Sequence, residues 1–309
     1  MSKLYDIGIA DIQKIALFTA PSAGAGDAIK AAALARQRFN DAGVDVISVQ
    51  ARDEATTEDY ARKLLAVDDI DALVVCGDDT LMNVLLQQQA GSAKPLGLIP
   101  AGEMPDLGRS LNIPPNPKRA ADIVMRGFYS TADLGRVEDR EGTKRWFATI
   151  ACSGFDARVT ERTSWFSGKL RGLRSPLAAV ASIRDLQPTP CEIRLDDGRV
   201  LSDDIIMCAF GNTQFYGQGM MMCPDANHHD GLLDISICTA SSLKDLATSM
   251  VKLYQHKNYH LEAFSYYRAQ SLTIEHENQP NAADCRSFSS EFMKVEAIEG
   301  AGRFLVPRP

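Results

Sequence analysis

The chain has 309 residues, of which 45% are hydrophobic and 24% are charged, and its formal net charge is −7 at pH 7. These values are typical of a globular protein with room for two domains, and the negative charge argues against nucleic acid as a main partner. No apolar run approaches the roughly 20 residues that a membrane-spanning helix needs.

Strand and helix patterns alternate over the first third of the chain. Buried strands are predicted at 14–20, 44–50, 71–77 and 95–102, and helices at 28–43, 56–69 and about 80–90. Alternation of this kind predicts an α/β fold, in which a doubly wound, mostly parallel sheet carries helices on both faces.

The pattern changes from about residue 130. Short segments of alternating polarity, separated by turn signals such as LDDGR and HHDGLLD, predict an antiparallel β-rich domain. Helical stretches near 169–186 and 242–258 interrupt it. We therefore expect an α/β domain over 1–130, a β-rich domain over 131–290 and a C-terminal segment over 291–309.

Three turns of the α/β part follow a strand and precede a helix. They are APSAGAG at 20–26, CGDDT at 76–80 and LIPAGEMPDLGRSL at 98–111. The amides at a helix N-terminus bind phosphate, and glycine allows close approach of the backbone. A structural interpretation is also open, in which Asp79 or Thr80 caps one helix and Pro105-Asp106 starts another.

A resemblance is carried by six segments that occur in one order: CGDDT, PLGLIPAGEMPDLGRSLNIP, DLGR, SGFDA, GNTQFYGQGMMMCPDANHHDGLLDISI and AADCR. The chain resembles the bacterial diacylglycerol-kinase-like lipid kinases, whose catalytic domain is related to NAD kinases and phosphofructokinases. The resemblance implies a nucleotide domain, a β-sandwich-like domain and an active site between them. It also implies that the segment 291–309 packs back on the first domain.

The family phosphorylates a hydroxyl of a membrane lipid, such as diacylglycerol, with ATP and Mg²⁺. Carried over residue by residue, the nucleotide-binding positions are Gly24, Gly26, Gly77, Asp78, Thr80, Gly102 and Asp106. The resemblance implies that Asp78 acts on nucleotide or Mg²⁺, that Asp106 shapes the site and that Asp284 orients the lipid hydroxyl.

Both later phosphate turns depart from the family pattern. Cys76 and Asp79 replace two glycines of Gly-Gly-Asp-Gly-Thr, and Glu103, Met104 and Pro105 interrupt Gly-Thr-Gly-Asn-Asp. At ~5 Å and an effective dielectric of ~20, each added carboxylate would repel a phosphate by about 3 kcal/mol. A further divalent ion bound by Asp79 and Glu103 would reverse that effect.

The position of the expected general base is also changed. The family carries a carboxylate there, and this chain carries Arg286, which cannot accept a proton at neutral pH. Catalysis without the base remains open, because phosphoryl transfer depends mostly on positioning and charge stabilisation. The alternative function is that of a degraded family member that binds a lipid or a nucleotide.

The loop PDANHHDGLLD keeps the family pattern in full. The resemblance implies a structural metal site made by Asp230 and the carbonyls of Asn227 and Leu232. Ligands that are all oxygen suit Mg²⁺ or Ca²⁺.

The remaining expectations concern partners and location. Seven cysteines without a Cys-x-x-Cys pair favour reduced thiols in the cytoplasm, and the family implies peripheral contact at the inner face of the membrane and a homo-oligomer. A basic and aromatic cluster could face anionic lipid or form a solvated helix face. Its members are Arg162, Trp165, Phe166, Lys169, Arg171 and Arg174.

Overall fold

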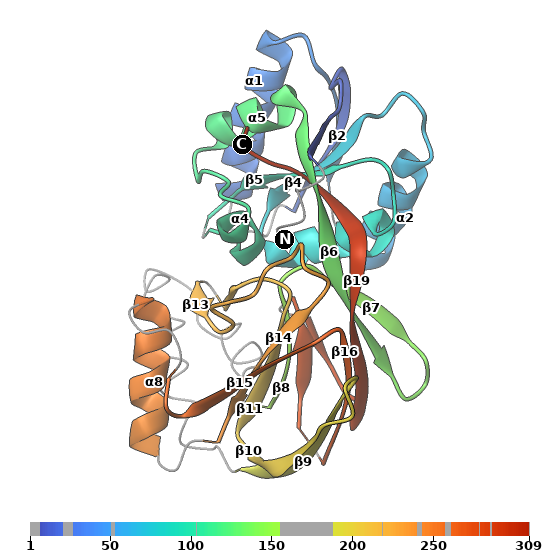
Figure 1. The fold of residues 1–309 in the computed structure, drawn as a ribbon. Helices are drawn as coiled ribbons and strands as arrows, with labels where there is room; N and C mark the ends of the chain where they lie inside the picture. The colour runs from blue at the N-terminus through green and yellow to red at the C-terminus, as the bar shows by residue number, and fades with distance from the viewer. Residues whose placement is uncertain are drawn as a thin grey trace. The chain divides into compact units, whose positions relative to one another are not determined.

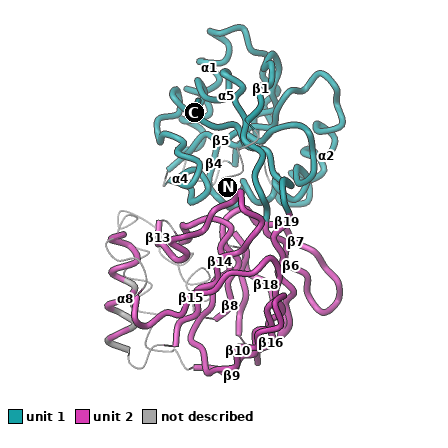
Figure 2. The backbone as a smooth tube through the Cα atoms, in the orientation of Figure 1, with its two compact units in different colours: residues 1–134, 299–309 teal, residues 135–298 magenta. Residues whose placement is uncertain are grey.

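The fold is that of a computed structural model. It describes residues 7–20, 27–50, 53–102, 104–154, 188–217, 219–239, 243–256, 261–277, 279–284 and 286–308. The chain forms two compact units, residues 1–134 with 299–309 (unit 1) and residues 135–298 (unit 2), which Figure 2 shows in different colours.

Unit 1 is built on a parallel sheet with the strand order β5-β4-β2-β3. Its four strands are β2 (Lys14–Thr19), β3 (Asp45–Gln50), β4 (Ala72–Gly77) and β5 (Leu96–Pro100). Its helices are α1 (Asp27–Asp41), α2 (Glu54–Leu65), α3 (Asp79–Gln89), α4 (Asp106–Ser110) and α5 (Pro117–Arg126). Every residue of β4 and β5 is buried, as expected for parallel strands with both faces covered.

Two long strands extend beyond the central sheet (Figure 1). They are β6 (Phe128–Asp139) and β19 (Phe292–Leu305), and β1 (Ile7–Ile9) pairs antiparallel with β6. The end of β19 lies parallel to β5, where Phe304 pairs with Leu96. Both ends of the chain therefore contribute to unit 1.

Local sequence explains the helix boundaries of unit 1, of which α5 is the clearest example. The side chain of Asn116 caps its start by accepting hydrogen bonds from the amides of Lys118 (3.0 Å) and Arg119 (3.2 Å). Gly127 ends it in the left-handed conformation, with φ 68°. A Cβ at Gly127 would lie 1.9 Å from the carbonyl oxygen of Ala10, so only glycine fits there.

Unit 2 is a sandwich of two antiparallel layers. One layer runs β10-β9-β16-β19, with β10 (Val200–Ile205), β9 (Thr189–Leu195) and β16 (Ser271–His276). The other runs β15-β14-β11-β8-β17-β18, with β15 (Phe264–Ala269), β14 (Leu233–Cys238), β11 (Met207–Gly211), β8 (Ile150–Gly154), β17 (Asn281–Ala283) and β18 (Arg286–Phe288). The other elements of unit 2 are the short strands β7 (Lys144–Phe147), β12 (Phe215–Tyr216) and β13 (Met220–Met221) and the helix α8 (Leu243–Gln255).

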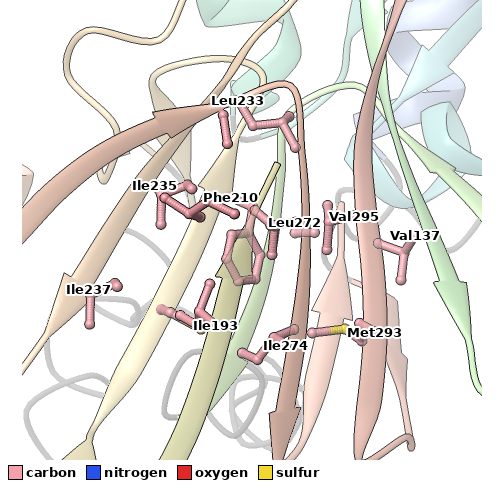
Figure 3. Close-up of a cluster of buried hydrophobic side chains, with 14 of the residues drawn as sticks. Val137, Ile193, Phe210, Leu233, Ile235, Ile237, Leu272, Ile274, Met293 and Val295 are labelled. Carbon is pink, nitrogen blue, oxygen red and sulfur yellow. The ribbon is translucent and has the colours of Figure 1, made fainter. Parts of the chain in front are cut away.

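The core of unit 2 lies between the two layers (Figure 3). One sheet supplies Phe210, Leu233, Ile235 and Ile237, and the other supplies Ile193, Leu272, Ile274, Met293 and Val295. Residues two apart along each strand share this face. In β8, β11 and β14 the residues between them are buried as well, in a second cluster on the other face of that sheet that includes Cys152, Met207 and Ala209.

The predicted fold class is confirmed, with a parallel-rich first part and an antiparallel sandwich after it. Both ends of α2 differ from the predicted helix over 56–69, since α2 begins at Glu54 and ends at Leu65. Asp53 is the N-cap of α2, because its Oδ1 accepts a hydrogen bond from the amide of Thr56 at 2.8 Å. Thr57 is buried and lies inside the helix, where it does not act as the cap. The predicted helix near 169–186 and the basic and aromatic cluster lie outside the described residues.

Six cysteines lie in the described part of the chain, and all six are buried. Burial raises the pKa of Cys76 and of Cys191 to about 12, so neither thiol ionises at neutral pH. Among the described helices, none has the length and apolar character that a membrane crossing requires.

Candidate active site

The turn after β4 begins α3. Asp78 is the N-cap of this helix, with its Oδ1 accepting a hydrogen bond from the amide of Leu81 at 3.1 Å. Gly77 is buried at the end of β4, and a Cβ there would lie 3.2 Å from the Leu81 side chain. Thr80 is exposed on the first turn of the helix. The turn therefore has the compact strand-to-helix form that the sequence predicts for a phosphate site.

Asp79 reaches a different helix from the one on which it stands. Its Oδ2 accepts a hydrogen bond from the amide of Asp106 at 2.8 Å, and its Oδ1 accepts one from the amide of Leu107 at 3.3 Å. These amides open α4, whose own N-cap position is Pro105 and makes no side-chain cap. Asp79 therefore supplies the missing cap across 27 residues of sequence.

This contact revises the expectation that Asp79 only repels phosphate. Its charge is directed at backbone amides of the second turn, and two hydrogen bonds stabilise it there. The same contact occupies amides that a phosphate at the second turn would use. The predicted second carboxylate, Glu103, lies outside the described residues, as do Gly24 and Gly26 of the first turn.

The second turn is closely packed around α4. Gly102 adopts a φ of 86°, which favours glycine, and Asp106 is buried with 2% of its surface exposed. A Cβ on Gly108 would lie 2.9 Å from the Leu98 side chain and 3.0 Å from Met104. Met104 thus packs against the helix, and the bulk predicted at this turn belongs to the packing of α4.

Asp284 holds a buried junction in unit 2. Its carboxylate accepts hydrogen bonds from the amide of Ala148 (2.7 Å), the amide of Thr149 (2.8 Å) and the hydroxyl of Thr149 (2.6 Å). Asp284 has 4% of its surface exposed and a φ of 45°, a conformation that Asp tolerates better than most residues. Its observed contacts fix the segment between β7 and β8.

The end of β11 completes this junction. The side-chain amide of Asn212 donates to the carbonyl oxygen of Ala148 at 2.8 Å, and the amides of Asn212 and Thr213 donate to the carbonyl oxygen of Thr149 at 2.9 and 3.1 Å. Sequence reasoning did not select Thr149, Asn212 or Thr213. The only sequence feature that could have indicated a role for these residues is their position within or beside the segments that carry the family resemblance.

Arg286, at the expected position of the base, opens β18. It pairs with Ala283 of β17, and its side chain is half-buried. Asp284 therefore directly follows β17, and Arg286 is the first residue of β18. Asp78 and Asp106 belong to unit 1 and Asp284 belongs to unit 2, so their joint role in one site stays a prediction.

The predicted metal loop joins β13 to β14, and an arginine of the strand β15 contacts it. Arg268 forms an ion pair through Nη2 with Oδ2 of Asp230, and its Nε lies 3.2 Å from Oδ2 of Asp234. The other oxygen of Asp230 accepts a hydrogen bond from the amide of Leu232 at 3.1 Å. The carbonyl oxygen of Asn227 accepts from the amides of His229 (2.8 Å) and Asp230 (3.3 Å). The three predicted ligands are close in sequence and in space, but this arrangement does not fit a divalent cation.

Burial shifts the pKa values of two side chains around this loop, Asp234 and His228. Burial raises the pKa of Asp234 to about 6, although the Arg268 guanidinium lowers it. Burial also lowers the pKa of His228 to about 4, and the neighbouring His229 adds to that effect. His228 is therefore a neutral ring at pH 7.

Two family models match the chain and together cover most of it. The diacylglycerol kinase catalytic domain matches residues 14–137, and the YegS C-terminal NAD kinase beta sandwich-like domain matches residues 149–301. A crystal structure described as a diacylglycerol kinase from Bacillus anthracis str. Sterne superposes with a TM-score of 0.72. It is 19% identical and covers 96% of this chain and 97% of its own, which supports the fold.

Relatives of higher identity agree with these matches. A diacylglycerol kinase of Mycobacterium tuberculosis (strain ATCC 25618 / H37Rv) is 37% identical over 272 residues, 86% of each chain. A diacylglycerol kinase of Staphylococcus carnosus (strain TM300) is 26% identical over 232 residues, 74% of this chain and 72% of its own. The chain belongs to the diacylglycerol-kinase-like lipid kinase family.

Proposed function

We propose that this protein transfers a phosphoryl group from ATP, with Mg²⁺, to a hydroxyl of diacylglycerol or a related membrane lipid. The observation that carries the proposal is the 37% identity, over 86% of each chain, to a protein named diacylglycerol kinase. The contact between Asp79 and α4 supports it further, because a carboxylate held by two amides repels a nearby phosphate less than a free one.

The proposed roles follow the two units. In unit 1 the turn at Gly77, Asp78 and Thr80 contacts the phosphates of ATP, and Asp106 maintains the shape of the second turn. Bound Mg²⁺ would neutralise charge on the transferred phosphoryl group. In unit 2, Asp284 acts as a positioning residue, because its contacts reach Ala148 and Thr149 and order that segment. It orients the lipid hydroxyl through that segment.

A second function is favoured by a specific observation, the replacement of the expected base by Arg286. In this alternative the chain keeps the fold and binds a nucleotide or a lipid without transferring phosphate.

The test is transfer of label from γ-labelled ATP into a bacterial lipid extract, with Mg²⁺ present. We expect labelled lipid with the native chain and a loss of about 10²-fold with Asp78→Asn, if Asp78 acts on Mg²⁺ or nucleotide. Asp41→Asn is the matched control, because it removes one carboxylate from an exposed position at the end of α1.

A restored variant separates the two functions. It carries Glu103→Thr, Met104→Gly, Pro105→Asn and Arg286→Glu, and it keeps Asp79 so that α4 stays capped. Label from the native chain supports the kinase. Label from the restored variant alone supports the non-catalytic alternative. If neither labels any lipid while both bind ATP by calorimetry, the kinase proposal is wrong.

A further inference from the structure

The loop between β13 and β14 carries a charge arrangement that the family resemblance does not predict. The carboxylates of Asp230 and Asp234 flank one guanidinium, that of Arg268 on β15. Asp234 and Arg268 are directly opposed residues of the antiparallel β14–β15 pair. The strand register therefore places the backbone of Arg268 opposite Asp234, next to the end of the loop.

Arg268 uses two different edges of its guanidinium. Nη2 contacts Oδ2 of Asp230, and Nε contacts Oδ2 of Asp234 at 3.2 Å. One planar cation thus joins the end of the loop to the strand that follows it. Arginine suits such a bridge, because its donors are fixed in a plane and its charge does not titrate.

Two of the three residues predicted to bind a metal already use oxygens within the loop. Asp230 Oδ1 accepts from the amide of Leu232, and the Asn227 carbonyl oxygen accepts from two amides. A divalent cation at Asp230 would also stand beside the positive charge of Arg268, which like-charge repulsion disfavours.

We infer that Arg268 is a built-in cation that takes the place of a divalent ion at Asp230, so that this loop is ordered without metal. The inference goes beyond the proposed kinase activity, because it concerns the loop and not the phosphoryl transfer. It holds whether or not the chain is a kinase.

The experiment compares thermal unfolding of the full chain in EDTA with unfolding in millimolar CaCl₂ or MgCl₂. We expect the native chain to unfold at the same temperature in all three solutions and to contain no stoichiometric metal after purification. We expect Arg268→Met to unfold at a lower temperature in EDTA and to regain part of the loss in CaCl₂. It should bind Ca²⁺ at least tenfold more tightly than the native chain does by calorimetry.

The matched control is Arg194→Met, which removes an exposed arginine of β9 that pairs with Glu192 on the same strand. Its unfolding temperature should not respond to either ion. Arg268→Lys keeps the charge but cannot make both contacts, so it should remain insensitive to Ca²⁺ while losing stability.

The inference is wrong if the native chain binds Ca²⁺ or Mg²⁺ stoichiometrically and Asp230→Asn abolishes that binding. This measurement needs no Arg268 variant, so it decides the matter even if Arg268→Met does not fold. Absence of such binding in the native chain, with a Ca²⁺ response appearing in a folded Arg268→Met, supports the inference.

Discussion

Asp79, at the start of α3, accepts a hydrogen bond from the backbone amide of Asp106, at the start of α4, with the oxygen and nitrogen 2.8 Å apart. A carboxylate that the sequence suggested as an obstacle to phosphate is thus a cap for a helix whose own N-cap residue, Pro105, makes no side-chain cap. The contact ties together two of the turns that the sequence predicts to bind nucleotide.

Asp79→Ala should lower the free energy of unfolding by about 1–2 kcal/mol, because two amides of α4 lose their acceptor. Asp79→Asn should recover part of this loss, since its side-chain oxygen can still accept one bond. Urea unfolding of the full chain measures both. Asp41→Ala, at an exposed position of α1, is the control, and an equal effect of the two alanine variants would contradict the role of Asp79.

Asp284→Ala should be more damaging, with a loss of about 3 kcal/mol or more. Two buried amides and one hydroxyl would lose their partner, and each buried amide left unsatisfied costs about 1–3 kcal/mol. Thr149→Val should cost less, because it removes only the hydroxyl donor.

A double-mutant cycle with Asp284→Ala and Thr149→Val tests whether the two act as one unit. We expect the double variant to be more stable than the sum of the single effects predicts. Strict additivity would show that Asp284 does not act through Thr149. In the labelling assay, a positioning role predicts that Thr149→Val shifts kcat in the same direction as Asp284→Asn.

His276 gives a prediction about acid sensitivity. Burial lowers its pKa from the ordinary value of 6.5, although the bond to Asn281 and the charge of Glu291 both raise it. The unfolded chain therefore takes up a proton first as the pH falls, and stability from the neutral ring is lost below about pH 6.5. No described residue accepts a hydrogen bond from the buried ring nitrogen Nδ1, so a second proton there would gain no acceptor from this part of the chain.

His276→Gln should be less stable than the native chain at pH 7.5, and the gap should narrow at pH 5.5. Unfolding free energies at pH 7.5, 6.5 and 5.5 measure this. Asn281→Ala is the control, because it removes the bond at 3.0 Å and keeps the ring, so its acid sensitivity should persist. A gap that stays constant for His276→Gln would exclude His276 as a source of acid sensitivity.

Two glycines in the same backbone conformation should respond differently to alanine. Gly43 (φ 79°) has open space around a would-be Cβ, whereas at Gly127 (φ 68°) the carbonyl oxygen of Ala10 lies 1.9 Å away. Gly43→Ala should cost about 1 kcal/mol for the backbone alone. Gly127→Ala should cost clearly more in urea unfolding, and equal costs would refute the steric argument.

Much of the fold could be predicted because its signals are local. The buried run of β4 and the helix patterns on either side of it depend on residues that are neighbours in sequence. The start of α2 was predicted too late, because Asp53 and Thr57 are both acceptable near a helix start. The choice between them was settled by burial of Thr57, which the sequence does not display.

The contacts at the candidate sites could not be predicted in the same way. Asp79 lies 27 residues from Asp106, Arg268 lies 38 residues from Asp230, and Asp284 lies 135 residues from Thr149. Each contact depends on strand order or register, which a single sequence leaves open. A family pattern can name the position of a carboxylate, but it does not name the partner that the fold brings to it.

The shared strand β19 has a consequence for the order in which the protein is made. Unit 1 needs the last residues of the chain, since the Ala301 carbonyl accepts from the amide of Gly91 at 2.7 Å and Phe304 pairs with Leu96. Unit 2 is one continuous stretch, residues 135–298, that leaves the ribosome earlier. The first strands of the α/β unit, although synthesised earlier, acquire these contacts with β19 only after all of unit 2 has been synthesised.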